Sequence, residues 1–111
     1  MNTRTLLLGL LASSLVACAI PEEDFPAKAG ASACARLAEC DAEDYEDIYG
    51  DDDAACVDDW SGIIEFYLDA GDLLGETYDE KKGRECVSEI RQADCSQIQN
   101  GEIDCDVWAD E

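Results

Sequence analysis

Residues 56–68 read CVDDWSGIIEFYL, and this stretch carries the clearest helix signal of the 111-residue chain. Its apolar residues recur every three or four positions, which places them on one face of an α-helix. They are Cys56, Trp60, Ile63, Ile64, Tyr67 and Leu68. Asp52 or Asp53 can cap the N-terminus, and Gly71 and Gly75 bracket the end. We therefore expect an amphipathic helix whose stripe, aromatic residues included, packs into a core.

A second helix is predicted before this stretch. Asp24 can cap it, and Pro26 suits the first helical position. Gly30 weakens the first half, so the firm part is expected to start near Ser32. The residues that can share its inward face are Ala33, Cys34, Leu37 and Cys40. Residues 41–53, which follow, are acidic and contain a glycine, so we expect a loop with a helical turn around residues 45–49.

A third helix is predicted from Tyr78 to about Ala93, because residues 77–80 (TYDE) have the pattern of a capping box. Its inward residues are Cys86, Val87, Ile90 and Ala93. Gly83 costs this helix about 1 kcal/mol relative to alanine. The chain after Cys95 is expected to be irregular, and no convincing strand alternation occurs. The prediction is a mostly α fold, a small three-helix bundle stapled by disulfides, with an irregular C-terminal tail.

The N-terminal segment has the pattern of a targeting signal. Arg4 supplies a positive charge, and residues 6–17 are uncharged and rich in leucine. This apolar run would extend only about 18 Å as a helix, against about 30 Å for the hydrocarbon core of a bilayer. Residues 15–18 (LVAC) resemble the lipobox of bacterial lipoproteins, which implies a signal peptide at 1–17 and acyl chains on Cys18. The alternative is an ordinary secretory signal in which Cys18 falls by chance.

The remainder divides into two parts on this interpretation. Residues 18–26 are the lipidated N-terminus and a tether, of which residues 19–24 would reach roughly 20 Å when extended. Residues 27–111 form the acidic domain with six cysteines. Removal of Arg4 with the signal leaves six basic and 28 acidic residues, a net charge of −22 in place of −21. The protein is thus expected to be exported and anchored in the bacterial cell envelope, in the outer membrane because Ala19 rather than aspartate follows the lipidated residue.

The six cysteines of the domain are predicted to form three disulfides: Cys34, Cys40, Cys56, Cys86, Cys95 and Cys105. Metal binding by these cysteines is disfavoured, because the chain has no histidine and no Cys-x-x-Cys pair. If the first two helices form a hairpin, Cys40 and Cys56 meet, and closing that loop stabilises the fold by about 3 kcal/mol. Cys34 would then pair with Cys86 or Cys95, and Cys105 with the one that remains.

Two cysteine-bounded segments point to a family. Residues 34–40 read CARLAEC and residues 86–95 read CVSEIRQADC, so five and eight residues separate the paired cysteines. With a central and a last cysteine, this pattern resembles the small cysteine-rich lipoproteins of myxobacteria and related deltaproteobacteria, a largely uncharacterised family. The resemblance implies the architecture and the location and supplies no activity. The chain is unusually acidic for the pattern.

Acidic residues dominate the middle of the chain, with seventeen acids and no base from residue 37 to residue 80. Such a surface repels phosphate, which excludes nucleic acid as a partner. Solvation of an exported domain is the simplest interpretation. The others are capture of a basic protein or envelope component, and Ca²⁺ binding, for which Asp51, Asp52 and Asp53 are weak candidates without an EF-hand pattern. No other cofactor is indicated.

Catalysis is not expected. The absence of histidine removes the common acid–base and triad arrangements. A carboxylate pair such as Asp58 and Asp59 would need a cleft that a small stapled bundle hardly offers. Trp108, near the C-terminus, is a candidate contact residue. The sequence therefore predicts a non-catalytic structural or interaction module with an acidic face, and the alternative is a Ca²⁺-binding module.

Overall fold

The computed structural model describes residues 19–103 and 105–110, so the predicted signal peptide and Cys18 lie outside the described residues. The described part forms five helices and no strand, with one isolated β-bridge between Tyr78 and Trp108. The helices are α2 (Phe25–Cys40), α3 (Ala42–Tyr49), α4 (Asp53–Leu73), α5 (Glu80–Gln92) and α6 (Cys95–Asn100). The prediction of a mostly α fold is confirmed.

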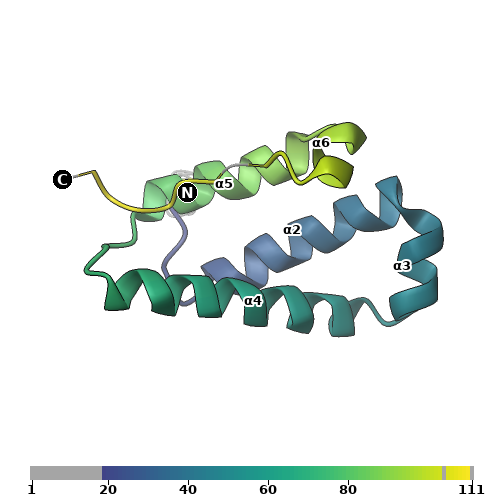
Figure 1. Cartoon of the computed structure of the whole chain (residues 1–111), viewed down its shortest axis with the longest axis horizontal. Coiled ribbons are helices and arrows are strands. Elements are labelled where there is room, and N and C mark those ends of the chain that lie inside the picture. The colour runs from purple at the N-terminus through teal and green to yellow at the C-terminus, as the bar shows by residue number, and fades with distance from the viewer. Residues whose placement is uncertain (1–18, 104, 111) are drawn as a thin grey trace, which may run out of the picture.

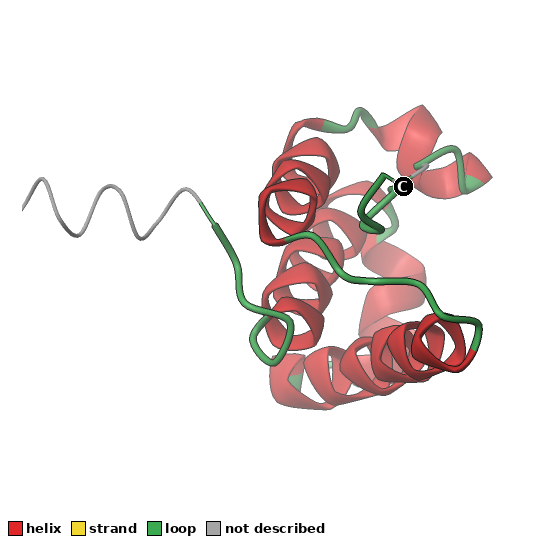
Figure 2. Ribbon diagram, turned by 90° about the vertical axis from the view of Figure 1, so that its left-hand side faces the viewer, coloured by secondary structure: helices red, strands yellow, loops and turns green. Residues whose placement is uncertain are grey.

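Helix α2 is the common partner of the other helices. It packs against α4 along much of its length and also against α5, whereas the backbones of α4 and α5 do not approach each other (Figures 1 and 2). Helices α4 and α5 therefore lie on two sides of α2 and leave a trough between them. This arrangement differs from a bundle in which all three long helices contact one another.

The N-terminal segment is packed, and the prediction of an extended tether over residues 19–24 is wrong. Ile20 is 6% exposed, its amide donates to the Glu80 carbonyl (3.2 Å), and its carbonyl accepts from Tyr78 Oη (2.8 Å). Helix α2 begins at Phe25, directly after Asp24 and with Pro26 in its first turn, as predicted. Its first half is also firmly packed, ahead of the firm part expected near Ser32, because Phe25 and Ala29 are buried in the core. Asp24 occupies the N-cap position, but its side chain makes no capping bond.

The acidic segment between α2 and α4 is more helical than expected, since residues 42–49 form the complete helix α3. Tyr45 anchors it: this side chain is 8% exposed and joins a core cluster with Cys34 and Cys56. Gly50, at φ +60°, ends the helix in a conformation that few other residues adopt. Asp52 then caps α4 by accepting from the Ala55 amide (3.1 Å), as predicted.

Helix α5 is capped by a different residue from the one predicted. Asp79 is its N-cap and accepts from the amides of Lys81 (2.9 Å) and Lys82 (3.1 Å). The Thr77–Glu80 capping box is therefore wrong, because the helix begins two residues later than the box requires and Asp79 accepts from its orphan amides. Gly83 has a packing role, since a Cβ there would overlap the Tyr78 ring and hydroxyl.

The chain after Cys95 is partly ordered as a helix, contrary to the expectation of an irregular segment. Asp94 and Gln97 form a reciprocal capping box at the start of α6. Beyond Gly101 the tail is irregular, as predicted, and runs back along α5 (Figure 1). Its end is fixed by two backbone hydrogen bonds, from the Asp79 amide to Val107 (2.8 Å) and from the Ala109 amide to Thr77 (2.7 Å).

The six cysteines form three disulfides, as predicted, but their pairing differs from the preferred one. The pairs are Cys34–Cys56, Cys40–Cys95 and Cys86–Cys105. Cys34 and Cys40 lie six residues apart on α2, so their side chains point about 120° apart around the helix. Cys34 therefore faces α4, and Cys40 faces α6. Helix α3 separates the end of α2 from the start of α4, which is why the predicted pair Cys40–Cys56 is wrong.

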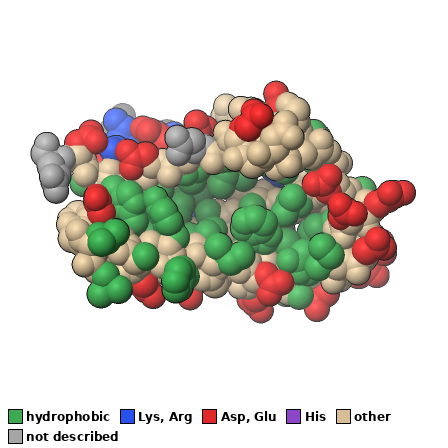
Figure 3. All heavy atoms as spheres, in the orientation of Figure 1, with side chains coloured by type: hydrophobic (Ala, Val, Ile, Leu, Met, Phe, Trp, Pro, Cys, Tyr) green, Lys and Arg blue, Asp and Glu red, His purple; other side chains and the backbone are tan. Residues whose placement is uncertain are grey.

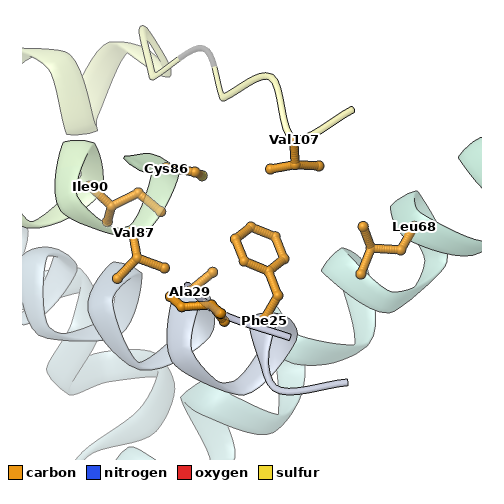
Figure 4. Close-up of a cluster of buried hydrophobic side chains, with 8 residues drawn as sticks. Phe25, Ala29, Leu68, Cys86, Val87, Ile90 and Val107 are labelled. Carbon is orange, nitrogen blue, oxygen red and sulfur yellow. The ribbon is translucent and has the colours of Figure 1, made fainter. Parts of the chain in front are cut away.

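The main core lies where α2, α5 and the tail converge. Phe25, Val87 and Val107 are at its centre, with the buried part of α4 contributing Leu68 (Figure 4). A second, smaller cluster surrounds the Cys34–Cys56 disulfide at the α3 end. The two clusters leave the middle of the trough without a covering element.

Candidate functional site

An open apolar groove of about 510 Å³ occupies the trough between α4 and the α5–α6–tail layer. Figure 3 shows this face, with apolar side chains gathered along α4 and across the hollow between the two layers. The volume lies within the range of about 300–1,000 Å³ that is usual for ligand pockets. This groove is the strongest candidate site in the described structure.

Helix α4 supplies one wall of the groove from the stripe that the sequence places in the core. Cys56 and Leu68 are buried as predicted, at 0% and 4% exposure. Ile63 and Tyr67, on the same stripe, are 60% and 46% exposed and line the groove, and Trp60 lines it as a half-buried side chain. The prediction that the whole stripe packs into a core is therefore wrong for its outer edge, because α5 lies too far away to cover it.

The floor and the opposite wall come from the core itself. Ala29 and Ala33 of α2 form the floor beside Phe25, and their short side chains leave the groove deep. Ile90 of α5 and Ile103 of the tail line the far side. Among the described residues, no charged side chain lines the groove, so these residues offer it apolar contact and no fixed charge.

Trp108 joins the tail to α4 beside the groove-lining residue Tyr67. Its Nε1 donates to Tyr67 Oη (2.9 Å), and the two ring centroids are 5.6 Å apart. Gly71 permits this contact, since a Cβ at that position would overlap the indole ring. The Cys86–Cys105 disulfide fixes the tail to α5 nearby. Trp108, predicted as a candidate contact residue for a partner, thus makes a structural contact within the chain.

Acidic residues gather at one end of the groove. Figure 3 shows acidic side chains gathered over α3, at one end of the apolar face. All four acids of α3 are exposed: Glu43, Asp44, Glu46 and Asp47. Asp59, which directly precedes Trp60 on α4, accepts a hydrogen bond from Tyr49 of α3. The groove is therefore an apolar surface with exposed acids at its α3 end.

Two basic side chains, Arg36 and Lys82, are held by neighbouring carboxylates and backbone carbonyls. Arg36 contacts Glu39 (2.8 Å) and the Ala93 carbonyl (2.6 Å). Lys82 contacts Asp110 (2.9 Å), the Trp108 carbonyl (2.7 Å) and, more weakly, Asp106. The hydrogen bond to Asp110 raises the pKa of Lys82, so this lysine stays charged. None of these contacts reaches α3.

Two of the three acids predicted as weak Ca²⁺ candidates accept local hydrogen bonds. Asp52 caps α4, and Asp53 accepts from Tyr45 Oη (2.6 Å), while Asp51 is exposed. Within the described residues, no three acidic or cysteine side chains converge as a metal site. Ca²⁺ binding therefore stays a prediction without a supporting contact.

The carboxylate pair considered for catalysis is on the surface. Asp58 and Asp59 are both exposed, and Asp59 accepts from Tyr49 Oη (3.0 Å). That hydrogen bond is one cause of the raised pKa of Tyr49, after burial of the ring. Neither carboxylate lines the groove. The structure does not bring these two acids together with the apolar cavity.

No family model matches the chain, and neither curated proteins nor solved structures give a match. Among the described residues, no helix combines the length and apolarity needed to cross a bilayer. The class of protein is therefore defined from its fold and its candidate site. The chain contains a small acidic helical domain, cross-linked by three disulfides and hollowed by an apolar groove.

The groove was not predicted from the sequence, although one signal for it is present. The stripe on α4 contains two neighbouring pairs of large apolar residues, Ile63–Ile64 and Tyr67–Leu68, so it is wide. A wide stripe needs partners on two sides, and α2 covers only the Ile64 and Leu68 side. A stripe that is wider than its partner helices can cover would have indicated an exposed apolar face.

Proposed function

We propose that the chain is a lipid-anchored protein of the bacterial cell envelope that acts as a non-catalytic interaction module for a basic partner. Acylated Cys18 would hold it in the outer membrane, and the scaffold would work as a three-helix bundle centred on α2, with α3 and α6 as additions. The lipobox-like sequence at residues 15–18 supports the anchor. The resemblance to small cysteine-rich lipoproteins supports the same location.

The observation that carries the interaction role is the uncompensated acidic surface of α3. Its four acids are exposed, and no base occurs between residues 37 and 80. Clustered like charges destabilise a domain through repulsion. A basic partner would relieve that repulsion, and the electrostatic field would accelerate its association at low salt.

Binding of a lysine-rich peptide, measured by calorimetry at several salt concentrations, tests the interaction role. The variant E43Q/E46Q/D47N should bind more weakly and with a shallower salt dependence than the parent. The matched control E65Q/E76Q/E85Q removes the same charge from scattered exposed positions and should bind more nearly like the parent. Equal losses in the two variants would mean that net charge alone attracts the peptide.

The anchor is tested separately by mass spectrometry of the protein from bacterial membranes. The proposal expects acyl chains on Cys18, and their loss together with membrane association in Cys18→Ser. An unmodified thiol at Cys18 would contradict it. A rise in melting temperature with millimolar Ca²⁺, absent with Mg²⁺, would favour the cation-binding alternative instead.

A further inference from the structure

We infer that the apolar groove binds an amphipathic helix that carries one apolar stripe and flanking lysine or arginine residues. This inference rests on the proposed function and names the shape of the basic partner. Three features of the described structure support it: the composition of the groove, the charges around it, and its position relative to the N-terminal end of the domain.

The composition of the groove suits an apolar stripe. Its walls are aromatic and aliphatic, and its volume of about 510 Å³ admits several side chains. Ile63 and Tyr67 present exposed apolar surface along its rim, and Phe66, 76% exposed, extends that surface outward on α4. Helix-in-groove recognition places residues of the i, i+3, i+4, i+7 type in such a trough.

The charges around the groove select a basic partner over a second copy of the chain. The chain carries a net charge of −21, so two copies meeting at this face would bring like charges together. Asp59 and Glu102 are exposed and directly precede the lining residues Trp60 and Ile103 in the sequence. Helix α3, with its four exposed acids, lies at one end. A helix seated in the groove would place its flanking bases against these acids.

The position of the N-terminal end favours a protein partner over the bilayer. In Figure 2 the groove face of Figure 3 points to the right, and the first described residues leave the domain on the left. Ile20 is pinned to α5, so only Ala19 separates the domain from the proposed anchor at Cys18. The groove would therefore face away from the membrane, toward proteins of the surrounding compartment.

Fluorescence titration of the full chain, purified from cells and held in phosphatidylcholine vesicles, tests the inference. The probe is a leucine–lysine peptide of about 18 residues with leucine at helical spacing. The peptide control has the same composition in scrambled order. Trp60 lines the groove and Trp108 packs against the lining residue Tyr67, so binding of the helical peptide should change the tryptophan emission. We expect the scrambled peptide to bind about tenfold more weakly, since it offers the same charge without a stripe.

Two substitutions of exposed apolar residues locate the binding surface. Ile63→Gln changes the groove wall at a residue that is 60% exposed, so the fold should be kept. Leu73→Gln is the matched control, because Leu73 is 89% exposed on the same helix and does not line the groove. We expect Ile63→Gln to weaken binding of the helical peptide by about tenfold and Leu73→Gln by less than about twofold.

The outcomes separate this inference from the proposed function. Equal, salt-dependent binding of both peptides would leave the interaction role intact and overturn the groove as the binding site. Failure of both peptides to bind would overturn both. A dimer in sedimentation that Ile63→Gln dissociates would show a self-interface, and quenching of the tryptophan emission by brominated lipids would show a membrane-facing groove. Either of these last results would overturn the inference.

Discussion

At the scale of single residues, two glycines inside helices have opposite roles. Gly62 of α4 is exposed and has open space where a Cβ would lie. Gly83 of α5 is buried against the Tyr78 ring and hydroxyl, which reach the Ile20 carbonyl. Helix propensity alone treats the two positions alike, favouring alanine by about 1 kcal/mol at each. Packing reverses that preference at Gly83.

We predict that Gly83→Ala destabilises the domain by about 1–3 kcal/mol, because the new methyl group displaces Tyr78 from its packed position. Gly62→Ala is the control and should stabilise by up to about 1 kcal/mol. Thermal melts followed by circular dichroism measure both, and each kcal/mol corresponds to about 4–8 °C in a domain of this size. A rise in melting temperature for Gly83→Ala would show that Tyr78 is not held against α5.

Tyr45 provides a titration signal for the contact between α3 and α4. The hydrogen bond to Asp53 raises the pKa of Tyr45 to about 12, with burial and the Asp53 charge acting in the same direction. The protonated phenol is the form that the fold favours. Its contribution to stability is therefore present below the ordinary tyrosine pKa of 10.0 and is lost as pH rises through about 12.

We predict that Asp53→Asn lowers the pKa of Tyr45 toward its ordinary value, since the charged acceptor is removed. Absorbance at alkaline pH follows the phenolate, and Tyr45→Phe identifies which step belongs to Tyr45. Asp51→Asn is the control, because Asp51 is exposed and makes no contact with Tyr45 that we describe. An unchanged titration in Asp53→Asn would mean that the 2.6 Å contact does not persist in solution.

At the scale of elements, the tail behaves as a strap that joins α4 to α5. Trp108 packs on Gly71 and Tyr67 of α4, while Cys105 is joined to Cys86 of α5. The tail therefore connects the two layers that have no direct helix–helix contact. Its hydrogen bonds to the segment before α5 complete the connection.

We predict that Trp108→Ala loosens the strap, with a local loss of about 1–3 kcal/mol, because the indole is partly buried and also donates a hydrogen bond. Hydrogen exchange at the Ala109 amide, which donates to Thr77, should accelerate by about tenfold or more. Amides of α3, far along the chain and held by Tyr45, serve as the internal reference. If α3 and Ala109 accelerate together, the tail unfolds only with the whole domain.

The elements also show which features the sequence could predict. Asp52 as the cap of α4 and the helix α4 itself depend on local spacing, and both are confirmed. The pairing of Cys40 with Cys95 depends on how α2 packs against α6, two helices that lie far apart in the sequence. The groove depends on the angle between α4 and α5, which is set by α2 and the tail. Non-local geometry therefore accounts for the errors at Cys40, Ile63 and Tyr67.

At the scale of the whole molecule, the net negative charge destabilises the folded state through repulsion. The net charge is −21, and the ion pairs seen within residues 19–103 and 105–110 include those of Arg36 with Glu39 and of Lys82 with Asp106 and Asp110. Exposed pairs of this kind contribute little to stability, typically about 0–1 kcal/mol each. Three disulfides compensate by restricting the unfolded chain, since the core clusters are small. Repulsion between carboxylates should thus be the main electrostatic effect on folding.

We predict that sodium chloride stabilises the domain. Screening lengths fall from about 30 Å at 0.01 M to about 10 Å at 0.1 M salt, so repulsion among the acids weakens more than the close ion pairs do. The melting temperature should therefore rise with salt by several degrees, and rise less in E43Q/E46Q/D47N, which has fewer acids to screen. Tetramethylammonium chloride is the control and should act like sodium chloride, because screening depends on ionic strength and not on a bound cation. A melting temperature that falls with salt would mean that the pairs at Lys82 and Arg36 outweigh the repulsion of the remaining acids.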